Sequence, residues 1–285
     1  MIKVFFLFVL LSITANSQVI SGTIISKEEN HPIPYAKIGV DKENFGVLAD
    51  HNGRFTIDLS TAKRASKIKV EVAGYETFLE NLENFIEKGD NVIVLHNKVK
   101  EIKEVIITPK VLVDKTWGVR TKTKSVLFVV NPETNQEVYN LETALQFSTK
   151  KRAKIKTINL NIASLVADQP IVLRYSIYSE KNGLPYQNIL EEEINAELTK
   201  DAIKDGTFTV DVNDRNIWIQ GKFFVGIHFL KQFKGEMQIS AAMLRTGYVR
   251  EFYSAWQKVM IAAPAINIDV KVDKNGKNYD SESHE

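Results

Sequence analysis

The chain has 285 residues, of which 37 are lysine or arginine and 35 are aspartate or glutamate, so its formal net charge is 37 − 35 = +2. This balance excludes a protein whose main partner is bulk nucleic acid. The hydrophobic fraction of 44% and the charged fraction of 25% are typical of a globular protein. Cysteine is absent, which excludes disulfides, thiolate metal sites and cysteine nucleophiles. At this length we expect two domains.

Residues 1–17 are predicted to be a secretory signal peptide. Lys3 supplies a short positive region, an apolar run follows it, and Ala15 and Ser17 form a small-residue cleavage pattern. The apolar run is shorter than the roughly 18–20 residues that span a bilayer. We therefore expect an exported protein with no transmembrane segment in the mature chain, in the periplasm, associated with the outer membrane, or secreted.

Residues 18–108 consist of short alternating segments separated by turn residues, which is typical of an antiparallel β fold. In Lys67–Ala73, apolar and charged side chains alternate, so one face is expected to be buried. Asn52 and Gly53 lie between Gly46–Asp50 and Phe55–Leu59 and predict a hairpin, because both turn residues tolerate positive φ. About seven strands in this length predict a small β-sandwich.

The same segment carries a set of short motifs: Gly22, Pro34-Tyr35-Ala36, Gly46, Asp50-His51-Asn52-Gly53-Arg54-Phe55 and Gly74-Tyr75. As a set they resemble the carboxypeptidase-regulatory-like domain, a transthyretin-like (prealbumin-like) β-sandwich of exported Bacteroidota proteins. Ile102–Thr108 is similar to the edge strand that follows this domain in that group, including its TonB-dependent receptors. The resemblance implies a non-catalytic module, because this domain of the zinc carboxypeptidases lacks the catalytic residues.

Residues 109–123 are predicted to be a linker, because Pro109 ends the preceding apolar segment and the following stretch is polar and basic. The β pattern resumes over residues 124–272, where eight or more strands favour a jelly-roll-like sandwich. The candidate strands are Ser125–Val130, Thr143–Ser148, Lys154–Ile162, Ile171–Ser179, Gly206–Val212, Lys222–Leu230, Glu236–Ala242 and Ile266–Val272. Residues 273–285 are predicted to be a disordered tail. The expected fold class is all-β, with two β-sandwich domains.

Residues 188–204 stay open between two interpretations. Their Glu- and Ala-rich composition favours a helix, whereas their position between strands favours another strand. Arg174–Tyr178, Gly206–Val212 and Phe223–Ile227 resemble, less specifically, the C-terminal sandwich that is paired with the regulatory-like domain in exported Bacteroidota proteins. That resemblance would make Ile189–Leu198 a strand.

The sequence carries no catalytic motif in a context that supports catalysis. None of the five histidines is followed by glutamate three residues later, as a zinc carboxypeptidase site requires. Ser148 and Lys151 match Ser-x-x-Lys, as do Ser60 and Lys63, but both pairs are expected at strand ends rather than at the start of a buried helix. We expect no catalytic residue, no metal ligand and no cofactor.

Positive charge is concentrated in residues 98–165, which hold 13 Lys+Arg against 6 Asp+Glu, a local charge of 13 − 6 = +7. The densest part comprises Lys150, Lys151, Arg152, Lys154 and Lys156. This group is interpreted either as a patch for an anionic partner, such as lipopolysaccharide phosphates, or as a solvated strand edge that blocks aggregation. The second interpretation is favoured.

Lys181–Asn188 is the best candidate ligand loop, because it combines glycine, proline and an aromatic ring. Tyr186 follows a proline, and Asn182 and Asn188 flank it. The alternative is a plain long hairpin without a ligand. A second aromatic group is interpreted either as a sugar-stacking platform or as core: Tyr248, Phe252, Tyr253 and Trp256.

The leading functional hypothesis is a non-catalytic exported envelope protein that binds protein or glycan, or serves as a scaffold. One alternative is a hydrolase of envelope material whose site is assembled from distant residues, with Ser148 and Lys151 as its testable pair. Another is an accessory protein of an outer-membrane TonB-dependent system.

Overall fold

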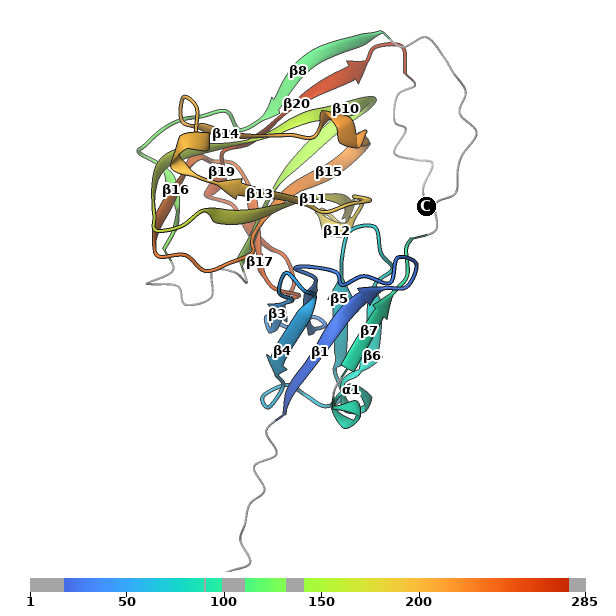
Figure 1. The fold of residues 1–285 in the computed structure, drawn as a ribbon. Coiled ribbons are helices and arrows are strands. Elements are labelled where there is room, and N and C mark those ends of the chain that lie inside the picture. Colours follow the sequence, from blue (N-terminus) through green and yellow to red (C-terminus); the bar gives the residue numbers. More distant parts are fainter. Residues whose placement is uncertain (1–17, 90, 99–110, 132–140, 277–285) are drawn as a thin grey trace, which may run out of the picture.

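A computed structural model of the chain describes residues 18–89, 91–98, 111–131 and 141–276. Within these residues the fold is all-β and forms two β-sandwich bodies stacked end to end, as Figure 1 shows. This confirms the predicted fold class. The predicted signal peptide, the Ile102–Thr108 segment and residues 277–285 of the predicted tail lie outside the described residues. The predicted start of the tail at residue 273 is wrong, because Asp273 is a buried residue of the last strand and the backbone N–H of Lys274 donates to the carbonyl oxygen of Val111 at 2.9 Å. Among the described residues, no helix is long and apolar enough to cross a membrane.

The first domain packs two sheets around one core. One sheet has the order β4-β1-β7, with β1 and β7 parallel, and the other has the order β3-β2-β5-β6. The strands are β1 (Val19–Ser26), β2 (Lys37–Val40), β3 (Gly46–Leu48), β4 (Arg54–Asp58), β5 (Lys67–Glu71), β6 (Phe78–Asn81) and β7 (Asn91–Leu95). In β5, Ile68 and Val70 are buried between exposed or half-buried neighbours, as the alternation predicted. The core therefore lies between the two sheets.

The predicted hairpin across Asn52 and Gly53 is wrong in its pairing. The turn forms, and the Asp50 carboxylate accepts hydrogen bonds from the backbone N–H groups of Asn52 (2.8 Å) and Arg54 (2.9 Å). The flanking strands then separate, since β3 pairs with β2 while β4 pairs with β1 in the other sheet. The turn is a crossing between sheets.

One helix in the first domain was not predicted. α1 (Leu82–Lys88) begins at Asn81, whose side chain accepts a hydrogen bond from the backbone of Glu83, and it buries Leu82 and Phe85. Its seven residues are too few for a helical period to stand out in the sequence. It caps the end of the first domain opposite the second domain (Figure 1).

The second domain is organised around one very long strand, β10 (Leu141–Ala167). Two separate strands were predicted in this region, but β10 continues through both and bends at β-bulges. Its first part lies between β15 and β17, its middle pairs with β20 and β14, and its end pairs with β16. The strand thus links all parts of the sheet around one main core, and a smaller apolar cluster lies on the side that faces the first domain.

The other strands of this domain are β8 (Leu112–Gly118), β9 (Leu127–Val130), β11 (Ile171–Lys181), β12 (Leu184–Asn188), β13 (Ile194–Leu198), β14 (Thr207–Asp211), β15 (Trp218–Phe229), β16 (Gly235–Met243), β17 (Gly247–Glu251), β18 (Gln257–Val259), β19 (Ala262–Pro264) and β20 (Ile266–Asp273). Short 3-10 helices occupy Lys200–Ala202 and Asn213–Arg215. Residues 188–204 therefore contain a strand, with helix limited to one short 3-10 turn.

The prediction of a linker over residues 109–123 differs from the structure. Leu112–Gly118 form β8, which pairs along its whole length with β20 at the end of the second domain opposite the first (Figure 1). Most side chains of β8 are exposed, so the sequence carries no alternation that would mark a strand.

Candidate functional site

A groove of about 650 Å³ lies on the second domain and is the candidate site. Three segments distant in sequence line it: the end of the β10 bulge, the stretch between β12 and β13, and the approach to β15. Its lining residues are Arg152, Ile189, Leu190, Glu191, Glu192, Ile194, Asp214, Arg215, Asn216, Ile217 and Trp218. Guanidinium, carboxylate, carboxamide and indole groups therefore face one hollow.

A β-bulge places the aromatic part of this groove. The register between β10 and β15 shifts between Thr149 and Ala153, which adds residues to β10 opposite the start of β15. Within this bulge, the Arg152 guanidinium lies 4.7 Å from the centre of the Trp218 ring. Such a cation–π contact holds the half-buried indole in a fixed orientation at the groove wall.

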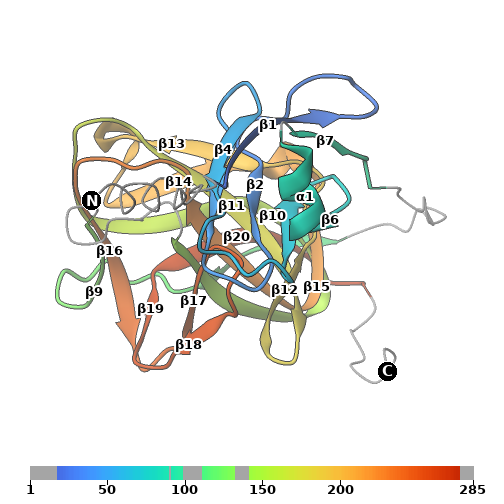
Figure 2. The same ribbon diagram turned by 90° about the horizontal axis from the view of Figure 1, so that it is seen from below.

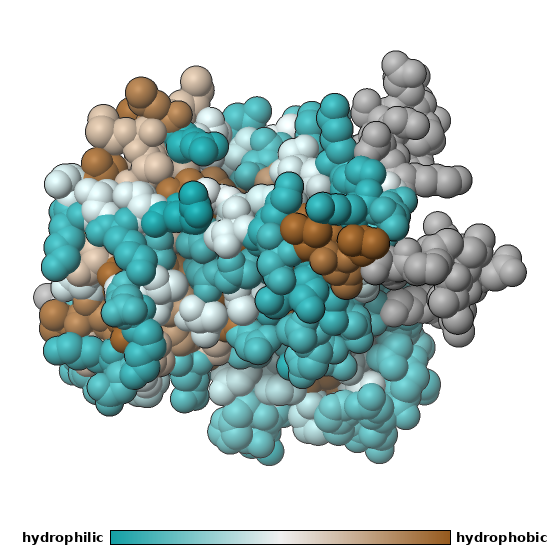
Figure 3. Space-filling model, turned by 90° about the horizontal axis from the view of Figure 1, so that it is seen from above, coloured by the Kyte–Doolittle hydropathy of each residue, from teal (hydrophilic) through white to brown (hydrophobic). Residues whose placement is uncertain are grey.

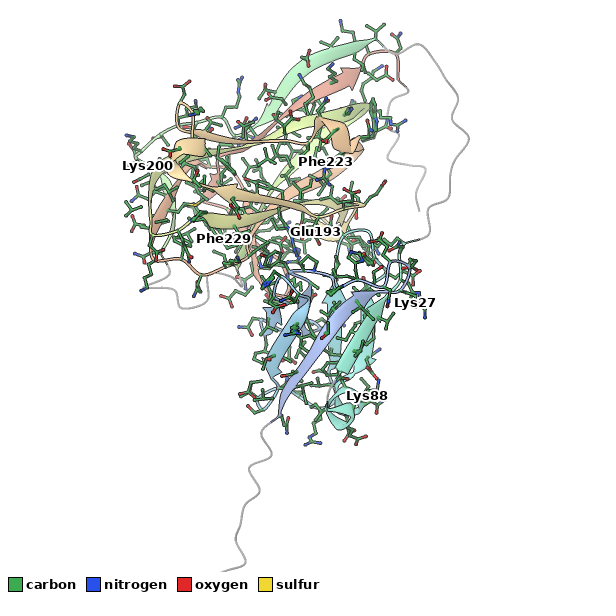
Figure 4. The ribbon with its side chains drawn as sticks, in the orientation of Figure 1. Lys27, Lys88, Glu193, Lys200, Phe223 and Phe229 are labelled. Carbon is green, nitrogen blue, oxygen red and sulfur yellow. The ribbon has the colours of Figure 1, made fainter. Side chains whose placement is uncertain are left out.

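The opposite wall, residues 189–194, rests on the first domain. A Cβ added to Gly74 would lie 2.0 Å from the carbonyl oxygen of Glu191, so only glycine permits this approach of the two backbones. The Glu193 carboxylate accepts a hydrogen bond from the backbone of Ala73 at 2.8 Å and pairs with Arg174 at 2.8 Å. Figure 4 shows Glu193 at the boundary between the domains. The first domain thus fixes one side of the groove.

Charge in the groove is nearly balanced. Two arginines stand against three carboxylates, and Arg215 forms an ion pair with Glu192 across the groove. Asn216 follows a 3-10 turn with φ of 52°, a left-handed conformation that asparagine tolerates. The groove therefore offers both hydrogen-bond donors and hydrogen-bond acceptors, and it has no net positive charge.

A second polar cluster, here called the junction cluster, lies buried between the domains. It comprises Lys37 of β2, Glu142 of β10, Tyr178 of β11 and Arg250 of β17. The Arg250 Nε donates to Glu142 Oε2 at 2.7 Å, and the Arg250 Nη2 donates to the Tyr178 hydroxyl oxygen at 3.1 Å. The Tyr178 hydroxyl in turn donates to Glu142 Oε1. Burial opposes the charge on Glu142, but Arg250 and Lys37 outweigh burial and lower its pKa to about 2.

Lys37 joins the first domain to this cluster. Its ammonium donates to the carbonyl oxygen of Phe252 at 2.7 Å and lies 3.7 Å from Glu142. In return the Tyr253 hydroxyl donates to the carbonyl oxygen of Lys37 at 2.7 Å. Burial and repulsion by Arg250 lower the pKa of Lys37 to about 7. The Glu142 carboxylate can balance only one of the two cations, Arg250 and Lys37. Because the guanidinium of Arg250 keeps its proton, Lys37 is the cation that is easily deprotonated.

The apolar part of the junction is the ring of Phe252, which is fully buried. A Cβ on Gly46 would lie 2.0 Å from this ring, and one on Gly39 would lie 2.7 Å from it. The two glycines form a notch in the first domain that this ring of the second domain fills. The junction is therefore closely packed as well as ion-paired.

The aromatic group proposed as either platform or core belongs to the core and the junction. Tyr248, Phe252, Tyr253 and Trp256 are all buried. Tyr248 packs edge-on against Phe224 with ring centres 4.9 Å apart, and Arg250 lies 4.5 Å from the Trp256 ring. No face of these rings is available as a stacking platform.

The predicted ligand loop, Lys181–Asn188, is mostly part of a β-hairpin. Asn182 and Gly183, both with positive φ, make a two-residue turn between β11 and β12, so Tyr186 and Asn188 belong to a strand. Tyr186 is half exposed, with the Lys181 ammonium 4.6 Å from its ring centre. The Asn188 side chain accepts a hydrogen bond from the backbone of Leu190. None of these three residues lines the groove.

The predicted basic patch is divided among several partners. Lys156 pairs with Asp114 at 3.0 Å, and the Lys151 ammonium donates to the carbonyl oxygens of Lys274 and Gly276, both at 2.9 Å. Arg152 is the only member that lines the groove, while Lys150 is exposed and Lys154 half-buried.

Sequence reasoning named Arg152 as one charge among five and missed Trp218, Glu142, Lys37 and Arg250. Trp218 comes 66 residues after Arg152, and a bulge brings them together. The junction cluster draws single residues from three strands of one domain and one strand of the other. No local pattern in the sequence marks either arrangement.

The arrangement defines a two-domain β-sandwich protein with a polar groove braced by its first domain. Residues 20–107 match the family model described as the CarboxypepD_reg-like domain, so the first domain is a carboxypeptidase-regulatory-like domain, as its motifs predicted. No curated protein matches the chain. Among solved structures, the chain is similar to the cysteine protease and lectin-like domains of Cwp84, a surface layer associated protein of Clostridium difficile. That likeness has a TM-score of 0.33 and 12% identity over 46% of this chain and 32% of that chain.

Proposed function

We propose that the protein is an exported, non-catalytic module of the cell envelope that binds a neutral or weakly charged glycan in the groove. The observation that carries the proposal is the placement of Trp218 beside paired polar groups in one hollow of about 650 Å³. Sugar rings present an apolar face that stacks on an indole and a rim of hydroxyls that hydrogen-bond to carboxylates, carboxamides and guanidinium groups.

The charge of the groove supports a glycan over an anionic partner. With two arginines against three carboxylates, and Arg215 already paired with Glu192, the site has no unbalanced positive charge for phosphate. Lys151 and Lys156, the members of the basic patch with polar partners, are engaged elsewhere. Lipopolysaccharide phosphates are therefore a poor match to this surface.

The contacts of Lys151 support a non-catalytic role. A lysine that activates Ser148 would need a free amine beside the hydroxyl, whereas the Lys151 ammonium donates to two backbone carbonyl groups. Among the described residues, no three His, Asp or Glu side chains are grouped so as to hold a metal ion. The domain type of the first sandwich supports a scaffold role.

A pair of variants tests the proposal. Trp218→Ala removes the groove indole, and Tyr186→Ala removes a half-exposed ring outside the groove. Each purified variant would be compared with the native protein on an array of envelope glycans. We expect Trp218→Ala to lose roughly tenfold or more in affinity, since stacking of a ring contributes on the order of 1–2 kcal/mol, and Tyr186→Ala to bind as the native protein does.

The reverse result, with loss in Tyr186→Ala alone, would move the site to the β11–β12 hairpin. Release of reducing ends from a bound glycan, abolished by Ser148→Ala with Lys151→Ala, would establish the hydrolase alternative. Capture of a TonB-dependent receptor without glycan binding would favour the accessory role.

A further inference from the structure

The three most exposed large apolar side chains of the described residues lie at two neighbouring turns, and a fourth exposed apolar side chain lies beside them. These turns, here called the apolar tips, join β16 to β17 and β18 to β19. Their side chains are exposed by 63% at Met243, 88% at Leu244, 75% at Met260 and 73% at Ile261. Figure 2 shows β18 and β19 at the lower left, seen from below. Figure 3 is the opposite view, from above, and apolar side chains gather at its upper left, which is the same end of the molecule.

The two tips form one unit. β16 and β19 are hydrogen-bonded neighbours up to the pair Met243 and Ala262. Beyond that pair, the backbone N–H of Leu244 donates to the carbonyl oxygen of Ile261 at 3.0 Å. The apolar side chains of both turns are therefore held together on a sheet edge.

Leu244, the most exposed of these side chains, also has an unfavourable backbone conformation. Leu244 has φ of 57°, a left-handed conformation that turns usually assign to glycine or asparagine. A polar or glycine residue would relieve this strain and remove the exposed apolar surface together. A strained leucine at such a position points to a use for its side chain.

The sequence segments that carry the tips are basic. The sequence has no carboxylate between Glu236 and Glu251 or between Glu251 and Asp269. The basic residues Arg245 and Lys258 lie beside the tips and are exposed. Projecting aliphatic side chains with basic neighbours fit the boundary between the headgroups and acyl chains of an anionic bilayer.

We propose that the apolar tips insert into the surface of an anionic lipid membrane and hold the protein there. A protein partner fits less well, because a stable interface buries about 800 Å² on each side and needs a broad surface rather than two projecting turns. The insertion is peripheral and is independent of the groove, whose lining residues come from other segments.

The test is co-sedimentation of the purified full chain with phosphatidylcholine vesicles that contain or lack phosphatidylglycerol. We expect binding to the anionic vesicles, and a roughly tenfold or greater loss in the double variant Leu244→Ser with Ile261→Ser. Arg245→Glu with Lys258→Glu should weaken binding to anionic vesicles and make it less dependent on salt. Val92→Ser is the matched control, because it removes a 65% exposed apolar side chain from the first domain.

Leu244→Trp gives a second readout, since the indole emission should shift to shorter wavelength when the tip enters lipid. Unchanged sedimentation in the tip variant, or no binding to anionic vesicles, would overturn the proposal. Self-association in size-exclusion chromatography that the tip variant abolishes, without vesicle binding, would instead assign the tips to a contact between copies of this chain.

Discussion

The junction cluster and the groove use the same kinds of side chain for opposite purposes. Both combine arginine, glutamate and aromatic rings, yet Glu142 is almost fully buried with its partners, whereas Glu192 and Arg215 pair at an open surface. Buried ion pairs fix geometry, because separating them leaves an unpaired charge away from water. Ion pairs at the groove can exchange protein partners for a ligand. Access to solvent, rather than residue type, distinguishes structure from recognition here.

The largest expected effect comes from Glu142→Gln, which leaves Arg250 buried without its counter-charge. We expect a loss of about 3–5 kcal/mol in the free energy of unfolding, measured by urea denaturation. Asp114→Asn is the matched control, because the Asp114–Lys156 pair is exposed by 70% and 33% at its two side chains, and such a pair contributes at most about 1 kcal/mol. Equal losses of unfolding free energy in the two variants would contradict the idea that the buried junction pair stabilises the protein more than the surface pair does.

A smaller effect is expected from Gly46→Ala, which tests the packing half of the junction. The new methyl group would meet the Phe252 ring and the carbonyl oxygen of Ile38, so both the docking of the domains and the pairing of β2 with β3 must shift. We expect a loss of about 1–3 kcal/mol by the same measurement. Adding Phe252→Leu should recover part of that loss, and strict additivity of the two changes would contradict direct contact.

The last prediction is a dependence of stability on pH due to Lys37, which is the smallest of the three effects over a single pH unit. Its pKa falls from 10.5 to about 7 on folding, so above pH 7 the unfolded chain binds a proton that the folded chain has released. Stability contributed by this group is therefore lost as pH falls through 7 and grows as pH rises from 7 towards 10.5, by up to ~1.4 kcal/mol per pH unit.

Urea denaturation between pH 7 and 9.5 would measure this slope, and Lys37→Met should remove it. The range stops below pH 10 because burial raises the pKa values of Tyr178 and Tyr253, which oppose the trend once tyrosines ionise in the unfolded chain. A slope that persists in Lys37→Met would assign it to another group.

The sequence predicted the features that depend on neighbouring residues, such as alternating strands and turns. The alternation in β5 was read correctly because one of its faces packs on the core of its own domain. β8 was missed because most of its side chains are exposed. The Asn52-Gly53 turn was recognised without its sheet crossing, because the crossing depends on pairing with strands far away in sequence. The groove and the junction were invisible for the same reason, since each joins side chains from segments tens to hundreds of residues apart.

The pairing of β20 with β8 and β10 has a consequence for how the chain acquires its fold. The first domain is contiguous, so it can fold as soon as its last strand, β7, has been made. The second domain cannot complete its sheet until residue 273 is present, because β20 pairs with β8 more than 140 residues earlier. Such distant pairings slow folding, and the residues that contact the first domain, Phe252 and Tyr253, also come late in the chain. A ribosome-bound chain therefore carries a folded first domain that cannot dock stably until the last strand of the second domain has been made.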